Sequence, residues 1–92
     1  MKRFFQASCH EDFAHLEIKI KLYGHIFEPE DFDIQIMDEN VLNVKAQDSE
    51  KKIDRKFKLP NNSLIQKIQS KLDVSKEENT QTLFINIPKE VL

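Results

Sequence analysis

The chain has 92 residues, which suffice for one small domain, because a second hydrophobic core would leave each half too small to fold unaided. Fourteen Lys and Arg against sixteen Asp and Glu give a net charge of −2, with the two signs interspersed, which argues against nucleic-acid binding. The single glycine excludes the glycine-rich phosphate loops of nucleotide-binding enzymes.

Apolar and polar residues alternate in at least five segments, which is the pattern of strands buried on one face. Pro29, between Phe27 and Phe32, marks a connecting turn whose two aromatic rings should point inward. Asp38-Glu39-Asn40 supplies turn residues for a hairpin between the second and third strands. The predicted strands cover residues 16–23, 33–37, 41–45, 53–59 and 82–87.

The segment from Asn61 to Asp73 fits two structures. Leu64, Ile65, Ile68 and Leu72 have helical spacing, and Ser63 with Gln66 resembles a capping box. Ile68, Ser70 and Leu72 also alternate as in a strand. Local rules favour the helix but leave the strand open, and residues 74–81 follow as a long polar loop.

The chemistry-bearing side chains form no ordered constellation. Cys9, His10, His15 and His25 lack the spacing of zinc ligands, and His15 should face solvent beside Glu17 and Lys19. The acidic pairs lie in predicted loops, where solvated carboxylates do no acid–base chemistry. We therefore expect no enzyme activity, no metal and no cofactor. The sequence contains neither a signal peptide nor a membrane-spanning stretch, and the single cysteine favours a reducing compartment, so the expected location is cytoplasmic.

Arg55 breaks the pattern of its strand, because it shares a face with Ile53, Phe57 and Leu59. A guanidinium group among apolar side chains needs a carboxylate partner or an exit to solvent. One interpretation is an arginine that reaches out at the edge of a sheet. The other is an ion pair across a contact between subunits.

Four segments together resemble the alpha-crystallin domain of small heat-shock proteins, in an order and spacing that agree over about 75 residues. The most specific are the turn around Phe27-Glu28-Pro29-Glu30 and the strand Arg55-Lys56-Phe57-Lys58-Leu59-Pro60. The four segments are residues 22–32, 41–45, 54–60 and 83–89.

The resemblance implies an all-β fold, an immunoglobulin-like antiparallel β-sandwich. It divides the chain into a short N-terminal arm (1–12), the domain itself (13–89) and a residual tail (90–92). It also implies that residues 67–72 form a strand after a turn at 61–66. Residues 52–58 then match the strand that pairs two subunits, with Ile53, Asp54, Arg55, Lys56 and Phe57 at the dimer interface.

The resemblance further implies a groove for peptides or client proteins between two edge strands. Phe4 and Phe5 are the corresponding N-terminal contacts for clients or assembly. The groove residues are Phe32, Ile34, Ile36, Ile68, Ser70 and Leu72.

Three departures from the family pattern affect the expected loop above the groove and the expected assembly. Residues 74–81 replace a shorter Asp-Gly turn, and the 46–52 connection is too short for a strand-swapped dimer. Four residues after Pro88 leave no room for the C-terminal extension that carries an Ile-x-Ile anchor, so we expect a homodimer or small oligomer.

The expected function is an ATP-independent holdase that binds unfolded or partly folded proteins. The alternative is a binding module without chaperone activity, which co-assembles with longer small heat-shock proteins or acts as a CS-domain-like cochaperone.

Overall fold

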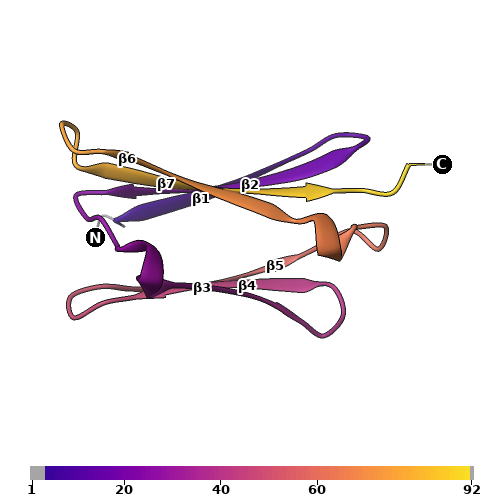
Figure 1. Cartoon of the computed structure of the whole chain (residues 1–92), viewed down its shortest axis with the longest axis horizontal. Coiled ribbons are helices and arrows are strands. Elements are labelled where there is room, and N and C mark those ends of the chain that lie inside the picture. Colours follow the sequence, from indigo (N-terminus) through magenta and orange to yellow (C-terminus); the bar gives the residue numbers. More distant parts are fainter. Residues whose placement is uncertain (1–3, 92) are drawn as a thin grey trace. The chain divides into compact units, whose positions relative to one another are not determined.

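The computed structural model describes residues 4–91 and contains two antiparallel sheets in that range (Figure 1). One sheet has the order β1-β2-β7-β6 and lies in a compact unit made of the chain up to residue 26 and from residue 64 on. The other has the order β3-β4-β5 and lies in residues 27–63. The strands are β1 (Phe5–Glu11), β2 (His15–Tyr23), β3 (Phe32–Met37), β4 (Val41–Gln47), β5 (Lys52–Lys58), β6 (Gln69–Ser75) and β7 (Thr80–Pro88).

In the four-stranded sheet, β2 and β7 are central and alternate strictly between buried and less buried residues. Each buried residue of β2 lies opposite a buried residue of β7, as Ile18 does opposite Ile85. Burying such aliphatic pairs stabilises the sheet by roughly 1.5–3 kcal/mol per fully buried side chain. The buried residues of the two strands are Leu16, Ile18, Ile20, Leu22, Gln81, Leu83, Ile85 and Ile87.

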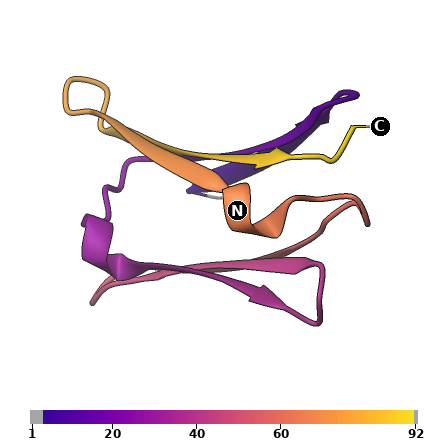
Figure 2. The ribbon, with the colours of Figure 1, turned by 45° about the vertical axis from the view of Figure 1, so that its right-hand side comes forward.

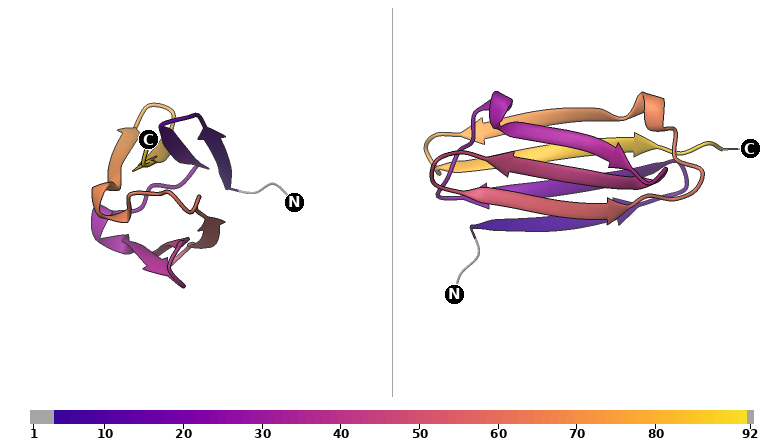
Figure 3. Two further views of the ribbon diagram at one scale, coloured as in Figure 1. Left: turned by 90° about the vertical axis from the view of Figure 1, so that its right-hand side faces the viewer. Right: turned by 90° about the horizontal axis from the view of Figure 1, so that it is seen from below.

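In the three-stranded sheet, β4 is the central strand, as Figure 3 (right) shows. Its residues Leu42, Val44 and Ala46 are almost fully buried, while Lys45 and Gln47 are exposed. The short 3-10 helix η1 (Pro29–Asp31) leads into β3 in Figure 2. Before it, Phe27 is 1% exposed and meets the half-buried Phe32 ring edge-on at 5.6 Å, which confirms that both rings point inward.

All five predicted strands are present, but the favoured helix over 61–73 is wrong. A single 3-10 turn, η2 (Ile65–Lys67), is followed directly by β6. Strand pairing decided this segment, because Leu72 lies opposite the buried Leu83 of β7. The expected loop over 74–81 is also wrong in extent: β6 runs to Ser75, and β7 begins at Thr80 after a four-residue turn.

Strand β1 was not predicted. It lies within residues 1–12, for which the sequence predicts an arm, and it pairs along its whole length with β2. The sheet therefore begins nearer the N-terminus than residue 13. The signal was weak but present, since Phe5, Ala7 and Cys9 alternate with polar residues.

Three non-glycine residues with positive φ close two of the hairpins, in a chain that has a single glycine. Asp38 (φ 49°) and Glu39 (φ 70°) join β3 to β4, and Asn79 (φ 54°) precedes β7. Asp and Asn tolerate this conformation better than other side chains, but Glu39 does not share that tolerance. In the part of the chain that the structure describes, no helix is long and apolar enough to cross a membrane.

Candidate functional site

The candidate functional surfaces are the open edges of the two sheets, and the first is the edge of β3. An antiparallel ladder alternates bonded and non-bonded residue pairs, so one known bond assigns them all. The Leu59 N–H donates to the Asn40 carbonyl at 2.7 Å, and Asp48 N–H donates to the Lys51 carbonyl at 3.0 Å. The ladder between them therefore directs the N–H and C=O groups of Leu42, Val44 and Ala46 toward β5.

The backbone N–H and C=O groups of Val41, Asn43 and Lys45 consequently point the other way, toward β3. Their partners on β3 are Met37, Gln35 and Asp33. The N–H and C=O groups of Ile34 and Ile36 therefore point to the open edge of the sheet. Both isoleucine side chains are half-buried and belong to the apolar face of the strand. Ile34 and Ile36, two of the residues predicted for the groove, thus combine open backbone groups with apolar side chains.

The second open edge belongs to β6, in the other unit. The Lys89 N–H donates to the Ala14 carbonyl at 2.8 Å in the register of the β2–β7 pairs, so the odd-numbered residues of β7 point toward β2 and the even-numbered ones toward β6. Their partners include Lys71 and Asp73, and the backbone groups of Ser70 and Leu72 therefore face the open edge. Leu72 is half-buried and Ser70 is exposed. Ile68, the third predicted residue, lies between η2 and β6, and its N–H donates to the Ile65 carbonyl.

The third open edge belongs to β5. Its odd-numbered residues, Arg55 among them, are bonded to β4, and its even-numbered residues face outward. The exposed positions on this edge thus carry charged side chains. They are Lys52, Asp54, Lys56 and Lys58.

Arg55 does share a face with the buried Ile53 and the half-buried Phe57, as its parity predicts. Arg55 is itself half-buried and lies opposite Val44 of β4. Because its backbone groups point into the sheet, the strand presents Asp54 and Lys56, rather than Arg55, at hydrogen-bonding positions of the open edge.

Phe4 lies directly before β1, and Phe5 is the first residue of that strand. The Tyr23 N–H donates to the Phe4 carbonyl at 2.7 Å, and Phe5 lies opposite Leu22. The two phenyl rings are 5.3 Å apart and edge-on, and the Phe4 ring is 6.2 Å from that of His25. Both side chains are half-buried.

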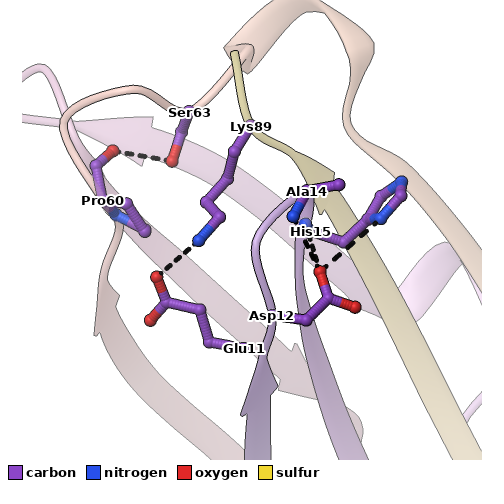
Figure 4. A network of polar contacts seen from close by, with 7 residues as sticks. All are labelled: Glu11, Asp12, Ala14, His15, Pro60, Ser63 and Lys89. Carbon is purple, nitrogen blue, oxygen red and sulfur yellow. Dashed lines mark hydrogen bonds and ion pairs between the residues drawn. The ribbon is translucent and has the colours of Figure 1, made fainter. Parts of the chain in front are cut away.

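The candidate catalytic and metal-binding residues are not assembled into a site. Among residues 4–91, no group of three His, Cys, Asp or Glu side chains could hold a metal ion. Cys9 and His15 are exposed, as predicted for His15. Hydrogen bonds from the N–H groups of Ala14 (2.9 Å) and His15 (2.7 Å) hold the pKa of the Asp12 carboxyl below its ordinary value of 3.8. These bonds shape the β1–β2 turn (Figure 4).

One ion pair missed from the sequence joins distant segments of the first unit. The Lys89 ammonium group is 2.9 Å from Glu11 Oε2, with side-chain exposures of 9% and 51% (Figure 4). The Lys89 N–H also donates to the Ala14 carbonyl at 2.8 Å. Through this ion pair and this backbone hydrogen bond, Lys89 connects the end of β7 to the β1–β2 hairpin. Sequence reasoning missed the pair because its partners are separated by 78 positions.

Solved structures of other proteins resemble this fold over most of the chain. Heat shock protein 16.0 from Schizosaccharomyces pombe superposes with a TM-score of 0.67 over 96% of this chain and 88% of that one, at 16% identity. The chain has the alpha-crystallin fold. A small heat-shock protein from Xylella fastidiosa, whose structure is described as a distinct high order structure, matches with a TM-score of 0.64 over 96% of this chain and 87% of that chain, at 17% identity.

The expected fold class, an all-β immunoglobulin-like antiparallel sandwich, is therefore confirmed. Neither a family model nor a curated protein matches the chain. At 16–17% identity, the likeness to small heat-shock proteins concerns the alpha-crystallin fold.

Proposed function

We propose that this protein is a small heat-shock protein that holds partly unfolded proteins without ATP and without enzymatic chemistry. The observation that carries the proposal is the chemistry of the β3 edge within an alpha-crystallin fold. Ile34 and Ile36 offer open backbone groups next to half-buried apolar side chains. An extended segment of an unfolding protein can add there as a strand, gaining backbone hydrogen bonds and apolar contact together.

The β6 edge supports the same function through Leu72, and Val74 adds a side chain that is 46% exposed. Phe4 and Phe5, two half-buried rings near the start of β1, are proposed as further apolar contacts for a bound client. Binding of this kind removes aggregation-prone chains from solution by mass action, so it requires no cofactor.

The proposal includes a homodimer formed through β5, with Ile53 to Phe57 at its centre. This strand is seven residues long, contains no proline and pairs on one side with β4. Among residues 4–91, no other strand pairs with its second side. A long unpaired edge of this kind is a template for a second chain.

The test is suppression of aggregation of a heat-denatured model protein at rising molar ratios, with absolute mass measured by light scattering in the same buffer. Suppression near equimolar ratios by a dimer supports the proposal. A dimer that suppresses nothing at several-fold excess overturns holdase activity. It would favour the co-assembling module, which is then tested by mixing with longer small heat-shock proteins.

Two neighbouring positions on β6 provide a matched pair of variants. Leu72→Ser removes an apolar side chain at the open edge, whereas Asp73→Ser changes an exposed residue whose backbone is bonded to β7. We expect Leu72→Ser to lower suppression by half or more and Asp73→Ser to leave it unchanged. Thermal unfolding of both variants separates a lost contact from lost folding. Equal suppression by both folded variants would remove β6 from the binding surface.

A further inference from the structure

The open edge of β5 carries four charged residues at hydrogen-bonding positions, and these restrict how a second copy can pair with it. When two identical strands pair antiparallel about a two-fold axis, opposed residues lie on the same face and exchange bonds at the open positions. An axis through Asp54, Arg55 or Lys56 pairs at least five residues of the strand, whereas an axis through Ile53 or Phe57 pairs three and is left aside. Each choice opposes different charges, and like charges directly opposite are destabilising.

An axis at Asp54 places the two Asp54 carboxylates together and Lys52 against Lys56. It opposes like charges at every open position and is excluded on that ground. An axis at Lys56 places Asp54 opposite Lys58, which is an attractive pair, but it also places the two Lys56 side chains opposite each other. In this register only residues 54–58 of each strand are paired. An axis at Arg55 opposes Asp54 and Lys56 twice and pairs all of 52–58, with its like charges, Lys52 opposite Lys58, at the two ends of the strand.

We propose that two copies pair through β5 with the axis at Arg55, so that Asp54 of each copy lies opposite Lys56 of the other. This register has one more hydrogen-bonded residue pair than the Lys56-centred one, and so two more backbone hydrogen bonds. The inference rests on the proposed dimer and adds the residues that fix its alignment.

A hydrogen bond within the sheet holds Asp54 in place for pairing with Lys56 of the second copy. The buried Asn43 side chain, 2% exposed, donates from Nδ2 to Asp54 Oδ1 at 3.3 Å. On the same face Asp54 lies opposite Lys45, and Lys45 lies opposite Asp33. Asp33, Lys45 and Asp54 thus form a row of alternating charge across the three strands. In the proposed register, Lys56 of the second copy lies next to Asp54 and extends this alternation.

The register has two costs, which its geometry reduces. Lys52 lies opposite Lys58 at both ends of the pairing, where long stems can turn the ammonium groups into solvent. On the other face the two Arg55 side chains meet at the axis. Each also lies diagonal to Phe57 of the second copy, whose ring face can take up the guanidinium group by a cation–π contact.

Cross-linking distinguishes the three registers. In a Cys9→Ser background, the variants Asp54→Cys, Arg55→Cys and Lys56→Cys are oxidised separately at a concentration where the wild type is dimeric. The non-bonded Arg55 position brings its two Cβ atoms to about 4.5–5.5 Å, close enough for a disulfide. We expect Arg55→Cys to cross-link at least about tenfold faster than the other two, whose equivalent atoms are about 7–8 Å apart in this register.

Charge exchange tests the pairing independently. We expect Asp54→Lys alone and Lys56→Asp alone each to raise the dimer dissociation constant roughly tenfold, since two attractive pairs become repulsive. The double variant and an equimolar mixture of the two single variants should both restore dimers, because each re-forms two opposite-charge pairs. Lys71→Asp, the same charge change on the exposed face of β6, is the control and should have no effect.

The outcomes separate this inference from the proposed dimer. If the wild type is dimeric but Asp54→Cys or Lys56→Cys cross-links fastest, the register is overturned and the dimer stands. The same holds if neither charge variant changes the dimer dissociation constant. A wild type that stays monomeric at millimolar concentration overturns both, and the lysines of β5 then protect the edge against pairing. Holdase activity is tested separately by aggregation suppression, and neither of these results supports or contradicts it.

Discussion

The two outer strands of the three-stranded sheet, β3 and β5, have similar lengths and the same alternation, yet they present different chemistry at their open edges. On β3 the outward backbone groups belong to Ile34 and Ile36, and on β5 they belong to the charged residues. The central strand causes the difference. Successive residues of β4 bond to opposite neighbours, so residues of one face bond β5 and residues of the other face bond β3.

Under the proposed function, this difference corresponds to two kinds of partner. A strand added to β3 places its bonded side chains beside isoleucines, so it is selected by apolar character. A strand added to β5 places its bonded side chains beside Lys and Asp, so it is selected by charge and alignment. A generic edge for unfolding chains and a specific edge for a second copy can therefore coexist on one small sheet.

The largest expected effect comes from proline, which tests the backbone assignment directly. Arg55→Pro removes a hydrogen bond to β4 and leaves the Val44 carbonyl without its donor, at a cost of about 2–4 kcal/mol. Lys56→Pro removes an N–H that faces outward and should cost clearly less, while still weakening the dimer. Chemical denaturation of the two variants decides the point. Equal losses of stability would mean that the ladder is assigned wrongly.

A smaller effect separates the proposed partners of the two edges. Ile34→Ser should lower stability by about 1–2 kcal/mol, since the side chain is half-buried, and should weaken aggregation suppression with the dimer intact. Lys56→Ser, at the exposed edge of β5, should shift the monomer–dimer equilibrium and leave suppression per subunit unchanged. Light scattering and the aggregation assay together give both readings. If one variant altered both, the two edges would not act separately.

The hairpins that connect the edges to β4 provide a still smaller contrast. Glu39 has φ 70° between β3 and β4, a conformation that costs a side chain other than Gly, Asn or Asp roughly 1 kcal/mol. Because Gly also costs about 0.4–1 kcal/mol through the entropy of the unfolded chain, Glu39→Gly should raise the free energy of unfolding by at most about 0.5 kcal/mol. Glu50→Gly, in the β4–β5 hairpin and without a positive φ, should lower it slightly. Thermal unfolding of the pair measures the contrast, and a destabilised Glu39→Gly would contradict strain in this turn.

The smallest expected effect lies outside both edges, in the β1–β2 turn. The pKa of Asp12 is lowered in the folded protein, so the charged carboxylate stabilises folding above pH 3.8 and this contribution is lost as the pH falls through the folded pKa. Asp12→Asn should remove that part of the acid sensitivity, because the side chain no longer titrates. A carboxyl titration by NMR with a midpoint at or above 3.8 would refute the effect.

The strong strand patterns and their burial follow from the sequence alone. In β2, Ile18 and Ile20 alternate with charged residues, and in β7 Asn86 lies between Ile85 and Ile87, which is the period of a strand buried on one face. The fold class and the candidate edge residues came from the family resemblance, to which the chain's Phe-Glu-Pro-Glu turn contributed. Local rules were misleading where apolar residues fit two periods, as between 61 and 73, because β7 and not local spacing decides that segment.

Tertiary structure alone decided three features of the candidate surfaces. Parity placed Arg55 on an apolar face, but only the ladder to β4 directs its backbone inward and leaves Asp54 and Lys56 at the edge. Pairing with β2 made a strand of residues 5–11, whose own signal is weak. The contact of Lys89 with Glu11 required strands to bring distant positions together. Alternation in a sequence determines which face a side chain takes, whereas a hydrogen-bonding direction exists only once a neighbouring strand is in place.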